Sequence, residues 1–178
     1  AKANPGQLTF SSAGNGTPSR IAGELFKTMT QTRLVHVPYK GGAPAVVDLL
    51  AGQVSLMLDN FLSVPGHIKA GKLRALGVST SKRSPLLSSV PTMAEAGVAG
   101  YEFTSWFGLL APARTPRETV EKIYADTRHI LLMADVQEKL RSQGAEPMAN
   151  TPGEFARALK ADTEKLRSVI KQSGARID

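Results

Sequence analysis

The chain has 178 residues, of which 42% are hydrophobic and 21% charged, a composition typical of a folded globular domain rather than a disordered segment. It contains no cysteine, which excludes disulfides, thiolate metal sites and thiol catalysis. The formal net charge of +7 would suit a nucleic-acid partner, but the basic residues are dispersed and only 6% of the residues are aromatic. The sequence therefore indicates a general basic surface, and we expect no nucleic-acid partner.

The first informative segment is a glycine-rich turn between a strand and a helix. Residues 8–10 predict the strand, and residues 11–18 form the first glycine turn. Thr17 is a suitable N-cap, and Pro18 is a suitable first residue for the helix that follows. The buried face of this helix should carry the apolar residues that recur four positions apart, namely Ile21, Leu25 and Met29.

A second turn of the same kind follows the next strand. Residues 34–37 predict that strand, and residues 37–44 form the second glycine turn. Pro44 should start the next helix, and Gly52 should end it. The residues that we expect on the core side of this helix are Val46, Val47, Leu49 and Leu50.

The two glycine turns together predict a site for a small anion. Glycine lets the backbone approach a ligand closely, and a helix N-terminus offers unpaired N–H donors and the positive end of the helix dipole. Such turns on successive strand–helix units predict a pocket for a carboxylate or phosphate, with the N–H groups of both turns facing one cleft. The candidate ligand-binding residues in the turns are Ser12, Gly14, Asn15, Gly16, Thr17, Tyr39, Lys40, Gly41, Gly42 and Ala43.

A third strand adds two polar candidates to this site. Residues 54–58 predict a buried strand, which ends at Asp59 and Asn60. Ligands bind at the carboxyl ends of strands in open α/β sheets, so both residues are candidate ligand contacts. Asp and Asn also fill turns and helix caps often, and the sequence alone leaves the two interpretations of Asp59 equally open. Lys40 is open in the same way, as a ligand contact or as an exposed loop lysine.

The order of the elements predicts an α/β fold in the first hundred residues and a helical tail. A short helix should run from about Pro65 to Gly71, and residues 73–78 predict another strand, so we expect a parallel or mostly parallel sheet covered on both faces. Residues 101–111 are also strand-like. The tail helices should follow three N-terminal caps, at Thr115, Asp135 and Thr151, with a domain boundary near residues 100–105.

The apolar faces of the tail helices raise the question of what covers them. The helices at residues 116–134 and 152–172 carry continuous apolar stripes, and exposed stripes of that length would form a large apolar patch. The tail offers few strands of its own for these helices to cover. We therefore expect either self-association or a longer polypeptide that supplies a sheet.

The sequence does not indicate a set of residues for catalysis or for metal binding. The three histidines, His36, His67 and His129, lie far apart, and surface or packing roles are favoured for each. No nucleophile–base motif or metal-binding motif is present. We expect no catalytic residue, cofactor or metal, and hence not an enzyme.

Several ordered blocks of this sequence resemble one family, the substrate-binding receptors of tripartite tricarboxylate transporters, known as Bug receptors in Bordetella. The resemblance is carried by residues 14–17, 22–26, 37–42, 59–60, 71–76, 90–97 and 105–108. Where the family commonly has His ahead of the Leu/Ile-Ala pair in the first helix, this chain has Arg20.

The resemblance implies a fold, a location and a function. The fold would be the type II periplasmic-binding-protein fold, with one complete lobe of mixed, mostly parallel sheet in residues 1–103 and the helical return to the other lobe in residues 104–178. A receptor of this family binds a small carboxylate between its lobes in the periplasm and delivers it to the integral-membrane permease. The alternative that the residues leave open is part of a doubly wound enzyme that binds a phosphorylated substrate.

Overall fold

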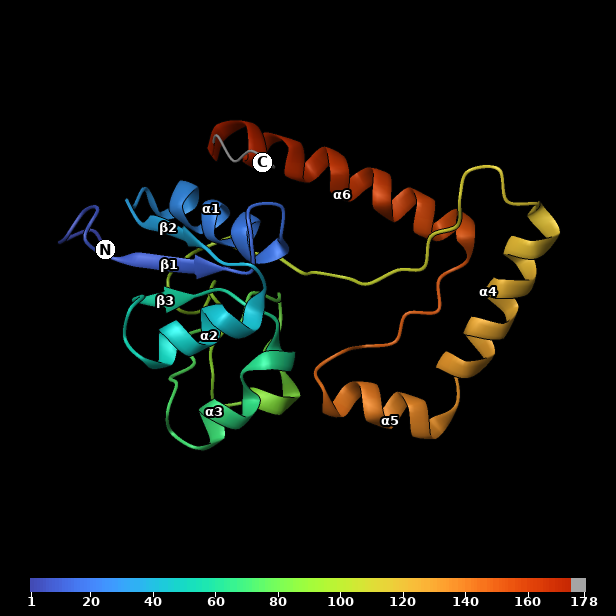
Figure 1. The fold of residues 1–178 in the computed structure, drawn as a ribbon, viewed down its shortest axis with the longest axis horizontal. Helices are drawn as coiled ribbons and strands as arrows, with labels where there is room; N and C mark the ends of the chain where they lie inside the picture. The colour runs from blue at the N-terminus through green and yellow to red at the C-terminus, as the bar shows by residue number, and fades with distance from the viewer. Residues whose placement is uncertain (174–178) are drawn as a thin grey trace. The chain divides into compact units, whose positions relative to one another are not determined.

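The computed structural model describes residues 1–173 and divides into two compact units (Figure 1). Unit 1 comprises Ala1–Ser105 together with the chain from Lys165 on, and unit 2 comprises Trp106–Glu164. Every candidate site residue lies in unit 1. The division within the described residues therefore leaves the candidate site in a single unit.

A three-stranded parallel sheet forms the centre of unit 1. Its strands are β1 (Thr9–Ser12), β2 (Val35–Pro38) and β3 (Leu56–Met57), in the order β2-β1-β3. Phe10 of β1 lies opposite His36 of β2 and Leu56 of β3. The prediction of parallel strands is confirmed, and the carboxyl ends of all three strands meet at one edge of the sheet.

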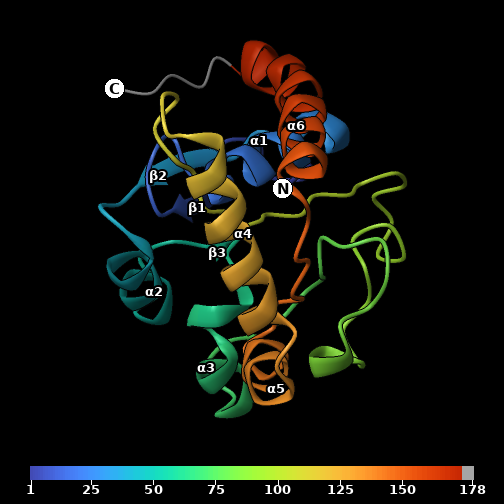
Figure 2. The same ribbon diagram turned by 90° about the vertical axis from the view of Figure 1, so that its right-hand side faces the viewer.

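One helix covers each face of this sheet (Figure 1; Figure 2). Helix α1 (Pro18–Thr30) lies so close to β1 that a methyl group at Gly23 would come within 2.2 Å of the Phe10 ring. Helix α2 (Gly42–Leu50) contacts β1 and β3 and buries Ala45 and Val46. The α/β class is confirmed.

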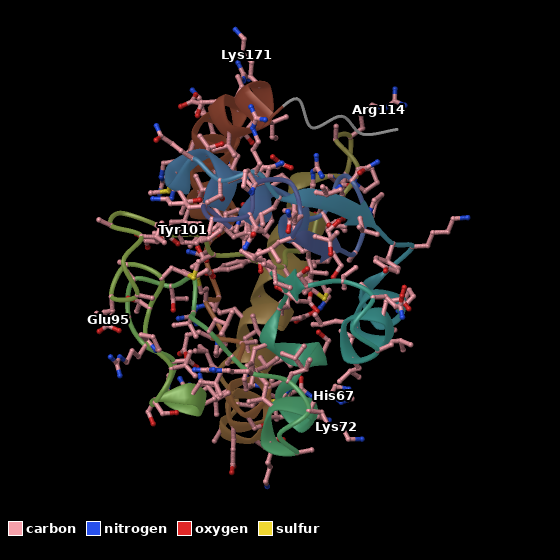
Figure 3. All side chains as sticks on the ribbon, turned by 90° about the vertical axis from the view of Figure 1, so that its left-hand side faces the viewer. His67, Lys72, Glu95, Tyr101, Arg114 and Lys171 are labelled. Atoms are coloured by element: carbon pink, nitrogen blue, oxygen red, sulfur yellow. The ribbon has the colours of Figure 1, made fainter. Side chains whose placement is uncertain are left out.

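The chain around residue 100 closes the core under α1. Ala22, Tyr101 and Phe103 are buried together, and the Tyr101 hydroxyl donates to the Ala22 carbonyl at 2.9 Å. Burial raises the pKa of the Tyr101 phenol far above its usual range. Figure 3 shows Tyr101 in the interior of unit 1, whereas Glu95 lies at its margin. Leu166 of α6 also packs against this cluster.

Three details of the first two helices differ from the sequence predictions. Helix α2 begins at Gly42, two residues before Pro44, because proline is tolerated anywhere in a first turn, where its missing N–H has no partner to lose. Met29 is 38% exposed and Val47 is 61% exposed, although the sequence predicts both on a core-facing side. Thr17 takes the N-cap position, but its side chain makes no cap hydrogen bond.

Two of the predicted strands are absent from the described residues. Residues 73–78 have no regular secondary structure and form only the isolated bridge between Val78 and Thr92. Residues 101–111 also have no regular secondary structure, although they make single contacts such as the 2.9 Å hydrogen bond from the Phe103 N–H to the Ser79 carbonyl. A strand needs a ladder of partners as well as a suitable sequence, and this ladder is missing here.

The segment after β3 contains short helices only. They are a 3₁₀ turn at Phe61–Ser63, α3 (Pro65–Lys69) and a second 3₁₀ turn at Pro85–Leu87. The predicted short helix is confirmed and ends before Gly71, whose φ is +68°. Thr92 and Glu95 form a capping box, and the hydrogen bond from the Thr92 N–H, followed by that from Arg83, holds the pKa of Glu95 below its usual range.

Three helices make up most of the tail, namely α4 (Arg117–Leu131), α5 (Ala134–Ser142) and α6 (Pro152–Ser173). The capping box at Thr151 and Glu154 forms as predicted. The box at Thr115 does not form, because Pro116 is the N-cap residue, and Asp135 lies inside α5, whose N-cap is Met133. None of these helices combines, within the described residues, the length and apolar character that crossing a bilayer requires.

The apolar face of α4 is exposed rather than buried. No residue of α4 or α5 is buried, and Ile123 and Ile130 are 45% and 51% exposed. Within the described residues this face has no cover, so the expectation that a second copy or further chain covers it stays a prediction. Within unit 2, the Trp106 indole N–H donates to Asp162 at 2.6 Å, and its ring meets Phe155 edge-on at 5.2 Å.

Candidate functional site

The two glycine turns lie side by side at the carboxyl edge of the sheet. The Tyr39 N–H donates to the Ser12 carbonyl at 3.0 Å, and the Gly41 N–H donates to the Ala13 carbonyl at 3.0 Å. Gly14 packs against the second turn, since a methyl group on it would lie 3.4 Å from the Tyr39 carbonyl oxygen. Because Gly14 has a φ of +141°, a side chain there would strain the backbone. The structure thus brings together the turns that the sequence placed on separate strand–helix units.

Hydrogen bonds inside the first turn fix its shape. The Thr17 N–H and hydroxyl both donate to the Gly14 carbonyl, at 3.2 and 2.7 Å. The Ala13 N–H donates to the Ser19 hydroxyl at 3.1 Å, and the Gly14 N–H donates to the Ser12 hydroxyl at 3.3 Å. Among the described residues, the N–H of exposed Gly16 has no partner. Gly16 is therefore the backbone donor that this turn keeps available.

The second turn keeps two backbone donors available. Gly41, with a φ of +117°, is the N-cap of α2, and its own N–H is engaged by the first turn. In the described chain, no hydrogen bond uses the N–H groups of Gly42 and Ala43, which open the helix. Both lie at the positive end of the α2 dipole, a place that suits an anion. Lys40 beside them is exposed.

The Tyr39 side chain is already engaged within unit 1. Its hydroxyl donates to Asp48 of α2 at 2.6 Å. That hydrogen bond raises the pKa of the Tyr39 phenol, because ionisation would put a phenolate against a carboxylate. A ligand would meet the ring of Tyr39 or would have to compete for its hydroxyl.

Asp59 and Asn60 reach the same edge from β3. Asp59 accepts a hydrogen bond from the Ser63 hydroxyl, and its Oδ2 lies 3.8 Å from the place that a methyl group on Gly42 would occupy. Asp59 therefore holds its own turn and also lies beside the second glycine turn, and its role as a ligand contact stays a prediction. The Asn60 side-chain oxygen accepts from Ser105 at 2.8 Å.

His36 belongs to this neighbourhood, although the sequence indicated only a surface or packing role. Its Nε2 lies 2.6 Å from the hydroxyl of the buried Ser12. Burial, with the positive charges of Arg20 and Lys27, lowers the pKa of His36 from 6.5 to about 4. The imidazole is therefore neutral at neutral pH. The signal that could have identified it is the strand register, since His36 and Ser12 lie two residues apart across paired strands.

A buried charge network lies behind the first turn on α1. Glu24, only 2% exposed, pairs with Arg20 at 3.0 Å and with Lys27 at 2.9 Å. The guanidinium of Arg20 lies 5.8 Å from the centre of the Phe10 ring, and its Nε and Nη1 have no hydrogen-bond partner in the described structure. One carboxylate against two cations leaves a positive charge in excess, which favours an anion nearby.

Metal-binding geometry is not present in the part of the chain that the structure describes. No three His, Asp or Glu side chains come together there in a way that could hold a metal ion. What the edge of the sheet offers instead is backbone N–H groups, one lysine and one carboxylate.

Comparison with known proteins shows which family this chain matches. The family model described as "Tripartite tricarboxylate transporter family receptor" matches residues 1–175. Protein BugT of Bordetella pertussis is 34% identical over 176 residues, a match that covers 99% of this chain and 54% of BugT.

Two solved structures share the fold and carry carboxylates in their descriptions. "R. palustris Rpa4515 with adipate" superposes with a TM-score of 0.92 at 40% identity, covering 98% of this chain and 58% of that one. "MatC (Rpa3494) from Rhodopseudomonas palustris with bound malate" superposes with a TM-score of 0.85 at 30% identity, covering 93% and 57%. This chain thus spans between one half and three fifths of the length of these three proteins.

Proposed function

This chain belongs to the tripartite tricarboxylate transporter receptor family, and from that premise we propose that it is the ligand-binding part of an extracytoplasmic solute receptor. Its ligand would be a small organic acid, bound through a carboxylate, and the protein would release the acid unchanged. Two relatives of the same fold are described with adipate and with malate, which supports a carboxylate as the ligand class.

The observation that carries the proposal is the pairing of the two glycine turns. Backbone hydrogen bonds join the turns, and the N–H groups of Gly16, Gly42 and Ala43 remain without partners among the described residues. Backbone donors at a helix N-terminus stabilise a carboxylate without needing a formal positive charge. In this proposal Ser12, Gly14, Asn15 and Thr17 shape the first turn, and Tyr39, Lys40, Asp59 and Asn60 determine which acid is accepted.

The family supports a location and a partner for the proposed receptor. We place the receptor in the periplasm, where residues 1–103 would serve as the second lobe and residues 104–178 as the return to the first. Delivery of the acid to the integral-membrane permease of the transporter would complete its role. No cofactor or metal is needed for capture and release.

A thermal-shift screen tests the proposal directly. The panel contains adipate, malate, tricarboxylates, acidic amino acids and aromatic acids, with inorganic phosphate as the comparison for a phosphorylated ligand. A ligand at 100 times its Kd should add about 2.7 kcal/mol to the free energy of unfolding. Stabilisation by one class of carboxylate supports the receptor. Stabilisation by phosphate and by none of the acids would contradict it.

A further inference from the structure

Ser12 links the half-buried His36 to the first glycine turn. Its hydroxyl lies 2.6 Å from His36 Nε2, 3.2 Å from the Gly14 carbonyl oxygen and 3.3 Å from the Gly14 nitrogen. The side chain of Ser12 is completely buried, so water cannot replace these partners. One hydroxyl therefore connects the imidazole on β2 to the turn that follows β1.

The hydroxyl of Ser12 carries a single proton, which it can give to only one acceptor at a time. In its neutral form protonated at Nδ1, His36 accepts the Ser12 proton at Nε2, across the short distance of 2.6 Å. When the imidazole is protonated, both of its nitrogens are donors. Ser12 must then accept from His36, and its own proton becomes free for the Gly14 carbonyl, 3.2 Å away.

Burial and the positive charges nearby keep His36 in the neutral state. Burial lowers its pKa most, followed by the charges of Arg20 and Lys27 of α1, and Glu24 pairs with both of these cations. Phe10 of β1 packs against the ring at a centroid distance of 4.8 Å and carries no charge. Ser12 is the polar group that contacts the ring directly.

We propose that His36 is a positioning residue, which sets the hydrogen bonding of the first glycine turn through Ser12 without touching the ligand. A proton gained by His36 moves the Ser12 proton to the Gly14 carbonyl and so changes the turn. The inference rests on the proposed function in one respect, namely that this turn contacts the carboxylate of the ligand. The link from His36 to Gly14 depends only on the contacts that the Ser12 hydroxyl makes with both residues.

Backbone-amide NMR of the protein that carries this sequence tests the link without any ligand. On acidification, the Gly14 amide signal should follow the titration of His36, measured in the same samples from its ring proton signals. In Ser12→Ala, His36 should still titrate, but the Gly14 amide should no longer follow it. His129→Gln, which removes an exposed histidine of α4, should leave both signals as in the wild type.

A variant at neutral pH covers the case in which the protein unfolds before His36 is protonated. His36→Leu removes the acceptor, so the Ser12 proton should pass to Gly14 and move its amide signal from the wild-type position. The same change should be absent when His36→Leu is made in the Ser12→Ala background. A Gly14 amide that is indifferent to His36→Leu in the wild-type background would overturn the proposal.

Ligand affinity supplies the second readout. With adipate or malate as the probe, Ser12→Ala and His36→Leu should each weaken binding about five- to tenfold, the equivalent of one hydrogen bond. The double variant should be no weaker than either single one, because both act through the same contact. Additive losses would contradict a path through Ser12. Absence of wild-type binding to any acid would instead count against the proposed function and leave the NMR result to decide the link.

Discussion

The proposed site depends on single residues of the two glycine turns, and Gly41 is the residue whose substitution tests it best. Its φ of +117° favours glycine, and a methyl group there would meet nothing within 4 Å. Gly97 has a similar φ of +104° and equally open surroundings, but it lies in the turn of the Thr92 capping box. The two positions therefore share the backbone strain and differ in their distance along the chain from the proposed donors.

We expect Gly41→Ala and Gly97→Ala to lose comparable stability, about 1–3 kcal/mol each from the strained backbone. Only Gly41→Ala should weaken carboxylate binding, by about tenfold or more, because it turns the Gly42 and Ala43 N–H groups away. Urea unfolding and ligand titration of both variants separate the effects. Equal affinities in the two variants would show that the second turn is not a ligand contact.

His36 should make the protein less stable in acid. Its pKa is about 4 in the folded state against 6.5 for an unperturbed histidine, so the unfolded chain binds the proton first. The stabilisation is complete above about pH 6.5 and is lost as the pH falls toward 4. We estimate the loss at about 1–2 kcal/mol, allowing for the partial exposure of the ring.

Denaturant unfolding between pH 7 and pH 4.5 measures this effect. Carboxylates also contribute to acid unfolding, so the informative quantity is the difference between the wild type and His36→Leu. That difference should shrink as the pH falls, while His129→Gln should parallel the wild type. A difference that stays constant with pH would refute the shift at His36.

At the scale of elements, the contact between α1 and β1 positions the first turn. A methyl group at Gly23 would lie 2.2 Å from the Phe10 ring, whereas one at Gly66 in α3 would meet nothing within 4 Å. Gly23→Ala must therefore displace the helix or the ring, and we expect a loss of about 1–3 kcal/mol from overpacking. Gly66→Ala should be neutral or slightly stabilising, since alanine is the better helix former. Thermal unfolding of the two variants measures their stabilities. A Gly23→Ala variant as stable as the wild type would contradict the close packing of α1 against β1.

The elements that sequence predicted well are those with local signals. The strand–turn–helix units were predictable because Gly and Pro mark their turns and helix starts. The strands at residues 73–78 and 101–111 were not, because pairing depends on partners that the local sequence does not contain. The contact between His36 and Ser12 was missed for the same reason, since it depends on the register of two strands 24 residues apart. The apolar stripe of α4 indicates that this face needs cover, but the local sequence does not say what provides it.

For the whole molecule, the exposed face of α4 predicts association. Ile123 and Ile130 are about half exposed, and Phe107, Leu109 and Leu110 of unit 2 are 70–79% exposed. Apolar surface of this extent favours cover by further chain or by a second copy. Sedimentation of the 178-residue chain should show self-association that grows with concentration. A compact monomer whose unit 2 amides resist hydrogen exchange would contradict this expectation.

Calorimetric titration of the best acid from the thermal screen, followed by analysis of the recovered ligand, tests the receptor function most directly. We predict saturable binding at one site, recovery of the acid unchanged, and an affinity that falls in Gly41→Ala but not in Gly97→Ala. Chemical conversion of the acid, or no saturable binding by any carboxylate in the panel, would contradict the account.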